Sequence, residues 1–239
     1  LNCSSNLSIA EMLEKIVSKG WFLNVTPGSK YVTIGGAIAN DVHGKNHHKD
    51  GSFSEYVKEM KIITPNGKIN ICSSKSENEL FKATCGGAGL TGVIVSIKLK
   101  LLKIKSKNLN VEIFKTKSID DTIQKFRELN ENKYLVAWLD TINKKNFGKA
   151  VIFSGDHSED EDLNLKLKKN FKLPSFIVSL FMNSFFVSLF NKLYFLKHRN
   201  NLKVKQDIDT FFYPLDRVLN WNKFYGKKGF TQIQILIKD

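Results

Sequence analysis

The stretch VTIGGAIANDVHGKNHH, residues 32–48, decides the fold of this chain. It joins a predicted strand, a glycine pair, a short apolar turn and a basic loop rich in histidine. A glycine pair lets the backbone come close to a ligand because glycine has no Cβ. If a helix begins just after the pair, its free N–H groups favour an anion such as a phosphate. Most glycine pairs are only turns, so the specific signal is the continuation into HGKNHH.

The composition is that of an ordinary globular protein, but the charge is unusual. The chain has 239 residues, enough for a large core in one or two domains. It carries 37 Lys+Arg against 23 Asp+Glu, a net charge of +14. This excess favours phosphates, an anionic membrane surface or nucleic acid as partners, and is equally typical of a lysine-rich solvated surface. No arginine-rich run or aromatic RNA-binding signature is present in the sequence, so we expect no nucleic-acid partner.

Cysteine usage and the chain ends bear on the compartment. Cys3, Cys72 and Cys85 form no CxxC pair and are odd in number. We therefore expect neither a disulfide framework nor a structural zinc site, and a reducing compartment fits better. The chain starts LNCSS, without an initiator Met or signal peptide, and stops just after a predicted strand. These features predict a piece of a longer protein that is cytoplasmic or peripheral on a membrane.

The texture of the chain changes near residue 105. Before it, the capping boxes at 8–11 and 76–79 predict helices, and Pro65-Asn66-Gly67 predicts a hairpin. After it, glycine is scarce, a helix is predicted from Ser118 with Ile123 and Phe126 facing inward, and strands follow. We predict an α+β fold with two domains, residues 1–104 and 105–239.

Residues 176–196 read FIVSLFMNSFFVSLFNKLYFL, with Lys192 as their one charge. Three interpretations are open. The segment can be a buried core helix, an amphipathic helix or lid that contacts a membrane or a lipid substrate, or a transmembrane span. Asn183, Asn191 and the serines weaken the transmembrane interpretation. The basic cluster of Lys192, Lys197, His198, Arg199 and Lys203 suits contact with anionic headgroups.

Several kinds of site are not expected from the motifs. His43, His47 and His48 could suggest a metal, but no acid or cysteine stands at ligand spacing, so we predict no metal site. The sequence has no GxSxG, no Walker lysine motif and no strand–GxGxxG–helix unit. What remains is a glycine-lined anion cradle over residues 28–43 and a second glycine loop over residues 86–92.

Residues 27–48 resemble the second half of the FAD-binding domain of the vanillyl-alcohol oxidase/p-cresol methylhydroxylase (PCMH) superfamily. The longer HGKNHHKDGSF (43–53) is similar to the decaprenylphosphoryl-β-D-ribose 2′-oxidase family, flavin subunits of an epimerase that makes the arabinose donor for cell-wall synthesis. The similarity continues in ELFKATCGGAGLTGVI (79–94), YLVAWLDTI (134–142) and FFYPLDRVLNWNKFYGKKGFTQIQILI (211–237). It implies the C-terminal part of a PCMH-type FAD-binding domain in 1–104. Part of an α+β substrate domain with an antiparallel sheet would follow in 105–239.

The resemblance also implies site residues. Non-covalent FAD would be held by Gly28, Ser29, Thr33, Ile34, Gly35, Gly36, Asn40, Asp41, Val42, His43 and Ile94. The substrate side would include Lys45, Trp138, Gln232 and Gln234, with His43 and Lys45 near the reactive edge of the flavin. Gln232 and Gln234 share one face of an alternating strand, as sugar-binding amides would, or as residues of a plain polar sheet face would. The catalytic base is expected to lie outside the chain.

Two departures from the family pattern matter. Phe212 stands where the family has a tyrosine, and Tyr213 stands where it has a histidine, so a pocket hydroxyl is lost or moved by one position. The family's first phosphate-binding half, and its C-terminal lysine and tyrosine that close the flavin site, have no counterpart in the sequence. We therefore predict that the 239-residue fragment is inactive and binds FAD poorly.

The function implied by the resemblance is FAD-dependent oxidation of the 2′-hydroxyl of a polyprenyl-phosphate-linked pentose to a ketone. The implied partners are this lipid-linked sugar phosphate, a short-chain reductase that completes the epimerisation, quinone or oxygen as electron acceptor, and a membrane surface at 176–196. One alternative is an aldonolactone or alditol oxidase of the same superfamily that acts on a soluble sugar. Another is a non-catalytic, membrane-associated lipid-binding module. The apolar 176–196 segment argues against the first alternative, and bound flavin would exclude the second.

Overall fold

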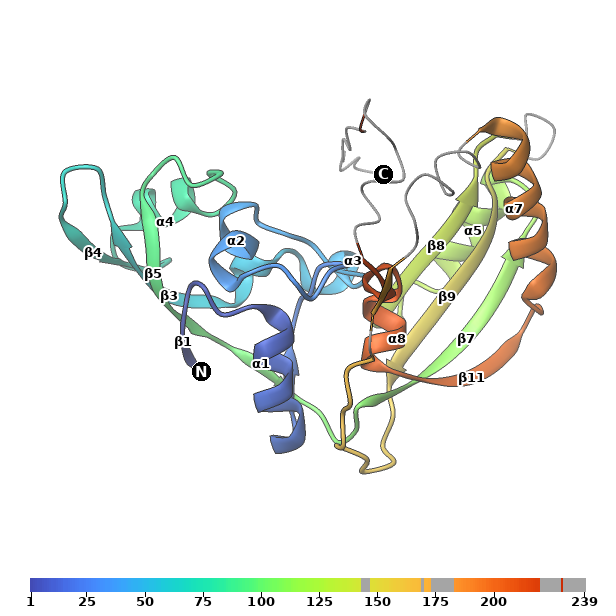
Figure 1. The fold of residues 1–239 in the computed structure, drawn as a ribbon, viewed down its shortest axis with the longest axis horizontal. Helices are drawn as coiled ribbons and strands as arrows, with labels where there is room; N and C mark the ends of the chain where they lie inside the picture. Colours follow the sequence, from blue (N-terminus) through green and yellow to red (C-terminus); the bar gives the residue numbers. More distant parts are fainter. Residues whose placement is uncertain (143–146, 169, 173–182, 220–228, 230–239) are drawn as a thin grey trace.

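A computed structural model describes residues 1–142, 147–168, 170–172, 183–219 and 229. They form two units, each built on a four-stranded antiparallel sheet and each with its own helices (Figure 1). The predicted α+β class is confirmed. The boundary predicted near residue 105 falls between the last strand of the first unit and the first strand of the second.

The first unit contains a sheet in the order β1-β5-β3-β4. Its strands are β1 (Asn2–Ser4), β3 (Val57–Ile63), β4 (Ile69–Cys72) and β5 (Val93–Leu99), and a separate antiparallel pair joins β2 (Trp21–Leu23) to β6 (Leu101–Lys103). Its helices are α1 (Ile9–Ile16), α2 (Ile34–Ala39), α3 (His47–Asp50) and α4 (Asn78–Thr84), with 3₁₀ turns at Val17–Lys19 and Phe53–Tyr56.

The two predicted capping boxes have different outcomes. At α1 both hydrogen bonds form, because Ser8 Oγ accepts from the Glu11 N–H and the Glu11 carboxylate accepts from the Ser8 N–H. At α4 the box is absent and that prediction is wrong. Its N-cap is Glu77, which has a φ of 51° and makes no side-chain capping bond.

The second unit contains a sheet in the order β11-β7-β9-β8. Its strands are β7 (Asn108–Thr116), β8 (Tyr134–Asp140), β9 (Lys149–His157) and β11 (Leu202–Asp207), and a short parallel pair joins β10 (Phe171–Lys172) to β12 (Val218–Leu219). Its helices are α5 (Ile119–Glu128), α7 (Ser184–Lys197) and α8 (Ile208–Phe212), with a 3₁₀ turn at Pro214–Arg217.

Helices cover both faces of this second sheet. On one face α5 packs through Thr122, whose hydroxyl lies 2.6 Å from that of Thr116. The predicted inward position of Ile123 is wrong, since its side chain is 44% exposed. On the other face lie α7 and α8. Of the 176–196 segment, residues 176–182 lie outside the described residues and the rest belongs to α7 or its N-cap. No described helix is both long and apolar enough to cross a membrane.

One hydrophobic core runs through both units. Phe211, Phe212 and Tyr213, in and just after α8, are buried. The ring of Phe212 packs 5.2 Å from that of Phe22 in β2 and 5.0 Å from that of Tyr134 in β8. The segment around α8 therefore packs against both units.

Candidate functional site

A cleft of about 810 Å³ lies where the two units meet. The first unit contributes two loops to its walls, and the second contributes one residue of α5, the middle of the edge strand β8 and the 3₁₀ turn after α8. The lining residues are Thr26, Pro27, Gly28, Ser29, Asn40, Val42, His43, Gly44, Lys45, Phe126, Leu135, Val136, Ala137, Leu215 and Asp216.

Six residues predicted for cofactor or substrate binding are among them. These are Gly28, Ser29, Asn40, Val42, His43 and Lys45. The two loops that carry them are separated by α2 in the chain and come together only in the folded molecule. The fold thus brings these six residues to one wall of the cleft, and their binding roles stay predictions.

The loop at residues 26–30 is held by the second unit. The hydroxyl of Thr26 lies 2.6 Å from that of Tyr213, and the N–H of Lys30 donates to Asp216 Oδ2 at 2.7 Å. The ammonium of Lys30 pairs with Asp209, and both side chains are buried. Apart from its chain neighbours, no atom of the described residues would lie within 4 Å of a Cβ at Gly28. The backbone at Gly28 is therefore fixed in place and open on one side.

The loop at residues 40–45 is braced from within the first unit. Asp41 adopts a φ of 40°, and its carboxylate accepts from Ser52 Oγ at 2.8 Å and from the Ser54 N–H at 2.9 Å. Asn40 donates its side-chain amide to the carbonyl of Gly36 at 2.9 Å. Asp41, predicted for cofactor binding, does not line the cleft and shapes the loop instead.

Lys45 connects this loop to the second unit. Its carbonyl accepts from the N–H of Leu135 in β8 at 2.7 Å. Its ammonium donates to the carbonyl of Phe211 and lies 4.5 Å from the centre of the Phe211 ring. Burial lowers the pKa of Lys45 to about 8. Lys45, with this lowered pKa, therefore stands among the residues that line the cleft.

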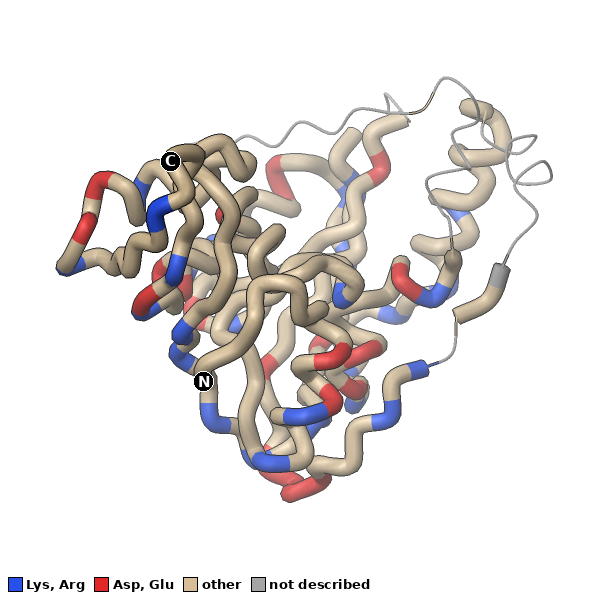
Figure 2. The backbone as a smooth tube through the Cα atoms, turned by 60° about the vertical axis from the view of Figure 1, so that its left-hand side comes forward, with Lys and Arg blue, Asp and Glu red and all other residues tan. Residues whose placement is uncertain are grey.

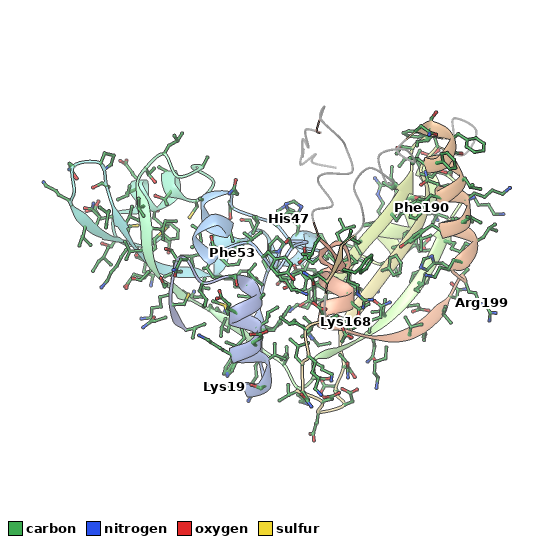
Figure 3. All side chains as sticks on the ribbon, in the orientation of Figure 1. Lys19, His47, Phe53, Lys168, Phe190 and Arg199 are labelled. Carbon is green, nitrogen blue, oxygen red and sulfur yellow. The ribbon has the colours of Figure 1, made fainter. Side chains whose placement is uncertain are left out.

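The three histidines of the 43–48 loop make different contacts. Burial, with a smaller effect from nearby His47, lowers the pKa of His43, and their rings meet edge to face at 5.9 Å. His47, which Figure 3 shows between the two units, contacts the carbonyl of Gly51 through Nδ1, and His48 contacts that of Asn132 through Nε2. Within the described part of the chain, no three His, Cys, Asp or Glu side chains form a possible metal site.

The glycine pair has a different role from the one predicted. Gly35 and Gly36 lie inside the first turn of α2, not before it. The N–H groups of Ile34, Gly35 and Gly36 donate to Leu7, Ser5 and the Thr33 hydroxyl within the chain. A Cβ on Gly35 would lie 3.0 Å from the Cβ of Ser5, so this glycine permits close packing of the chain on itself. The expectation of free N–H groups here is wrong for these three.

The remaining predicted residues lie elsewhere. Thr33 is exposed at the N-cap of α2, and Ile94 is buried in β5. Trp138 is half-buried on β8, with its ring centre 4.9 Å from that of Tyr194 in α7. Gln232 and Gln234 lie outside the described residues. Thr33, Ile94 and Trp138 are not among the described residues that line the cleft.

Sequence reasoning missed the buried charges that position the cleft. Lys30 and Asp209 are 179 residues apart, so no local pattern links them. The one available signal was a carboxylate inside the apolar run around IDTFFY, because an acid there needs a partner.

The lining of the cleft combines apolar side chains with a few polar groups. Its walls at Pro27, Val42, Phe126, Leu135 and Leu215 are apolar, and a few polar groups converge between them. Such a combination is typical of cofactor sites. The open side of Gly28 permits close backbone approach, and the Lys45 ammonium suits a negative phosphate.

Comparison with known proteins agrees with this geometry. Residues 7–73 match the family described as "FAD binding domain", and they contain both first-unit loops of the cleft. The match to this family is carried by the segment that holds Gly28 and His43. The predicted cofactor, FAD, and the resemblance to the PCMH-type superfamily are therefore confirmed.

Similar proteins include several flavin oxidoreductases. The decaprenylphosphoryl-beta-D-ribose oxidase of Mycolicibacterium smegmatis is 30% identical over 99% of this chain and 54% of its own length. Cytokinin dehydrogenase 3 of Arabidopsis thaliana is 33% identical over 36% of this chain and 17% of its own length. The Delta(24)-sterol reductase of Homo sapiens is 23% identical over 66% of this chain and 31% of its own length. The chain thus spans about half the length of the first relative.

Proposed function

We propose that the protein is an oxidase that converts the 2′-hydroxyl of a polyprenyl-phosphate-linked pentose to a ketone. The observation that carries the proposal is the 30% identity to a decaprenylphosphoryl-beta-D-ribose oxidase along 99% of the chain, which includes both walls of the cleft. FAD, when bound, would supply the two-electron acceptor. The alcohol would lose a hydride to it and a proton to a base that we do not assign.

The residues of this chain would bind and orient the cofactor and the substrate. Gly28, Ser29, Asn40, Val42 and His43 would contact the cofactor, and the apolar side chains of α5 and β8 would exclude water. Lys45 would attract the substrate phosphate while it is protonated. The predicted cofactor residues Thr33, Ile34, Gly35, Gly36, Asp41 and Ile94 would act from outside the cleft wall.

The substrate side of the proposal includes Trp138, Gln232 and Gln234. Because Trp138 packs on Tyr194, only its exposed part would reach a substrate. A short-chain reductase would complete the epimerisation, and quinone or oxygen would reoxidise the flavin. Together these partners make the oxidation the first half of a change of configuration at one carbon.

The test uses the visible absorption band of bound flavin in the purified full-length protein, because the 239-residue fragment is itself expected to bind FAD poorly. Anaerobic addition of a polyprenyl-phosphoryl ribose is expected to bleach the band, because the flavin is reduced. Bleaching by a soluble aldonolactone or alditol, and not by the lipid-linked sugar, would favour an oxidase of soluble sugars. A protein without flavin would contradict both assignments.

A variant tests whether the cleft is the flavin site. Gly28→Leu adds a side chain on the open side of the backbone, so we expect flavin affinity to fall about tenfold or more with the melting temperature unchanged. Ala83→Leu adds the same side chain at an exposed position of α4 and serves as the matched control. Equal flavin content in both variants would move the site away from Gly28.

A further inference from the structure

Helix α7 packs on the second sheet through one side only. The ring of Tyr194 meets Trp138, and Asn191, which is buried, donates to Asp140 Oδ1 at 2.8 Å. The ring of Phe195 lies over the ammonium groups of two lysines of the sheet, at 4.0 Å and 3.7 Å. These contacts fix which side of α7 faces away from the protein.

The outer side of α7 is apolar and exposed. The exposed fractions are 70% for Phe185, 42% for Leu189, 56% for Phe190, 57% for Leu193 and 64% for Leu196. All of these except Phe190 recur every three or four residues, so those four side chains share one helix face. A globular protein usually turns such a face inward, and an exposed one marks an interaction surface.

The charge around this face has a single sign. Residues 163–206 contain nine Lys and Arg but no Asp or Glu, although the chain has 23 acidic residues. Lys192 and Lys197 are exposed on α7, and Arg199 follows its C-terminal end (Figure 3). In Figure 2 the tube of α7 carries blue positions and no red one.

We infer that the outer face of α7 lies on an anionic lipid surface, with Phe185, Leu189, Leu193 and Leu196 in the acyl boundary. Apolar side chains flanked by lysines without acids are the composition of interfacial helices. A second copy of this chain is a poorer occupant, because a symmetric dimer would bring the same lysine-rich face against itself. Charge complementarity therefore favours lipid headgroups.

This surface has a defined relation to the cleft. Strand β8 carries α7 through Trp138 and Asp140 and lines the cleft through residues 135–137. Strand β8 therefore contacts both α7 and the cleft. The inference does not rest on the proposed substrate, because vesicle binding and flavin bleaching are measured separately.

The test is sedimentation of the purified protein with vesicles. We expect binding to phosphatidylcholine vesicles that contain phosphatidylglycerol, and at least about tenfold weaker binding to pure phosphatidylcholine. The double variant Leu193→Gln, Leu196→Gln is expected to lose about tenfold or more in partitioning to the anionic vesicles. Its matched control is Ile69→Gln, Leu90→Gln, which changes two exposed apolar side chains of the first unit, 68% and 87% exposed.

Charge variants complete the design. Lys192→Gln, Lys197→Gln is expected to weaken binding about tenfold, whereas Lys58→Gln, Lys68→Gln on the first unit is expected to leave it unchanged. All four positions are exposed, so circular dichroism should show an intact fold. Wild-type protein that does not bind anionic vesicles would overturn the inference. Equal binding by the Leu193, Leu196 variant and by its Ile69, Leu90 control would also overturn it. A dimer broken by the Leu193, Leu196 change without vesicle binding would identify a second copy as the occupant.

Discussion

Lys30 and Lys45 are two lysines at the junction whose surroundings differ. Lys30 is buried beside the buried carboxylate of Asp209, so its charge is compensated. Among the described residues no carboxylate forms an ion pair with Lys45, whose ammonium meets a carbonyl and an aromatic ring. Burial then favours the neutral amine of Lys45, which explains its lowered pKa.

The first prediction concerns the pH dependence that Lys45 imposes on stability. Folding lowers the pKa of Lys45 from 10.5 to about 8, so between these values the unfolded chain holds more protons. The free energy of unfolding should therefore rise with pH across this window, and the destabilisation should be full below pH 8. Urea denaturation of wild type and of Lys45→Met on both sides of the window measures this. An identical pH slope in the two proteins would contradict it; Lys58→Met, at an exposed lysine, is the control.

The second prediction concerns Tyr213, next to the position where the family pattern implies that a pocket hydroxyl is lost or moved by one position. The Tyr213 hydroxyl lies beneath the cleft, 2.6 Å from that of Thr26, and burial raises its pKa. Tyr213→Phe should destabilise the fold by about 1–2 kcal/mol, because the Thr26 hydroxyl loses its partner. Adding Thr26→Val should cost less than the sum of the two single changes. Additive losses in thermal unfolding would mean that the bond contributes nothing.

At the level of elements, the two capping-box sequences show how tertiary context acts on a local signal. Both have serine followed three residues later by glutamate. At α1 the chain enters in an extended conformation, with Ser8 at a ψ of 155°, and the box closes. At α4 the preceding loop turns through a left-handed Glu77, so the helix starts two residues after Ser76 and the serine cannot reach its first turn.

The third prediction follows from this difference. Ser8→Ala should destabilise the protein by about 1 kcal/mol, because the Glu11 N–H loses its side-chain acceptor. Ser76→Ala should leave the free energy of unfolding within about 0.5 kcal/mol of wild type. Denaturant titration of the two variants compares them directly. Equal losses would show that the second box forms in solution.

On the scale of the whole molecule, the cleft depends on the docking of one unit on the other. Lys30 contributes its N–H to Asp216 and its ammonium to Asp209, and Asp209 also accepts from the N–H of Lys168 at 3.0 Å. The loop that carries Gly28 is thereby attached to the segment around α8. Loss of the Lys30–Asp209 pair would change the cleft, although neither residue is among the described residues that line it.

The fourth prediction tests that attachment. Lys30→Met should destabilise the protein by about 3–5 kcal/mol, because it leaves the buried Asp209 charge unpaired. Combining Lys30→Met with Asp209→Asn should recover part of the loss, since the asparagine is neutral and still accepts from Lys168. Lys105→Met breaks an ion pair between exposed side chains and should leave stability unchanged. A Lys30→Met variant as stable as wild type would show that this pair does not hold the units together.

Much of the fold followed from local patterns. Local signals act over a few residues and do not depend on distant parts of the chain. They predicted the helix after Ser8, the helix after Ser118 and the hairpin at residues 65–67. The motif also singled out the two loops whose six predicted binding residues line the cleft, because a binding motif occupies a short run of sequence. The glycine pair was misassigned because glycine permits close approach to any neighbour, and here the neighbour is Ser5.

The contacts between the two units could be identified only in the tertiary structure. Local sequence was sufficient for the FAD-binding segment and the α+β class, because capping, alternation and glycine spacing act over short distances. It could not pair Lys30 with Asp209 or Thr26 with Tyr213, since these contacts join residues 179 and 187 positions apart. Nor could it choose between core and surface for the apolar helix α7. That choice depends on which side meets the sheet, and packing of Asn191 and Tyr194 leaves the apolar stripe outside.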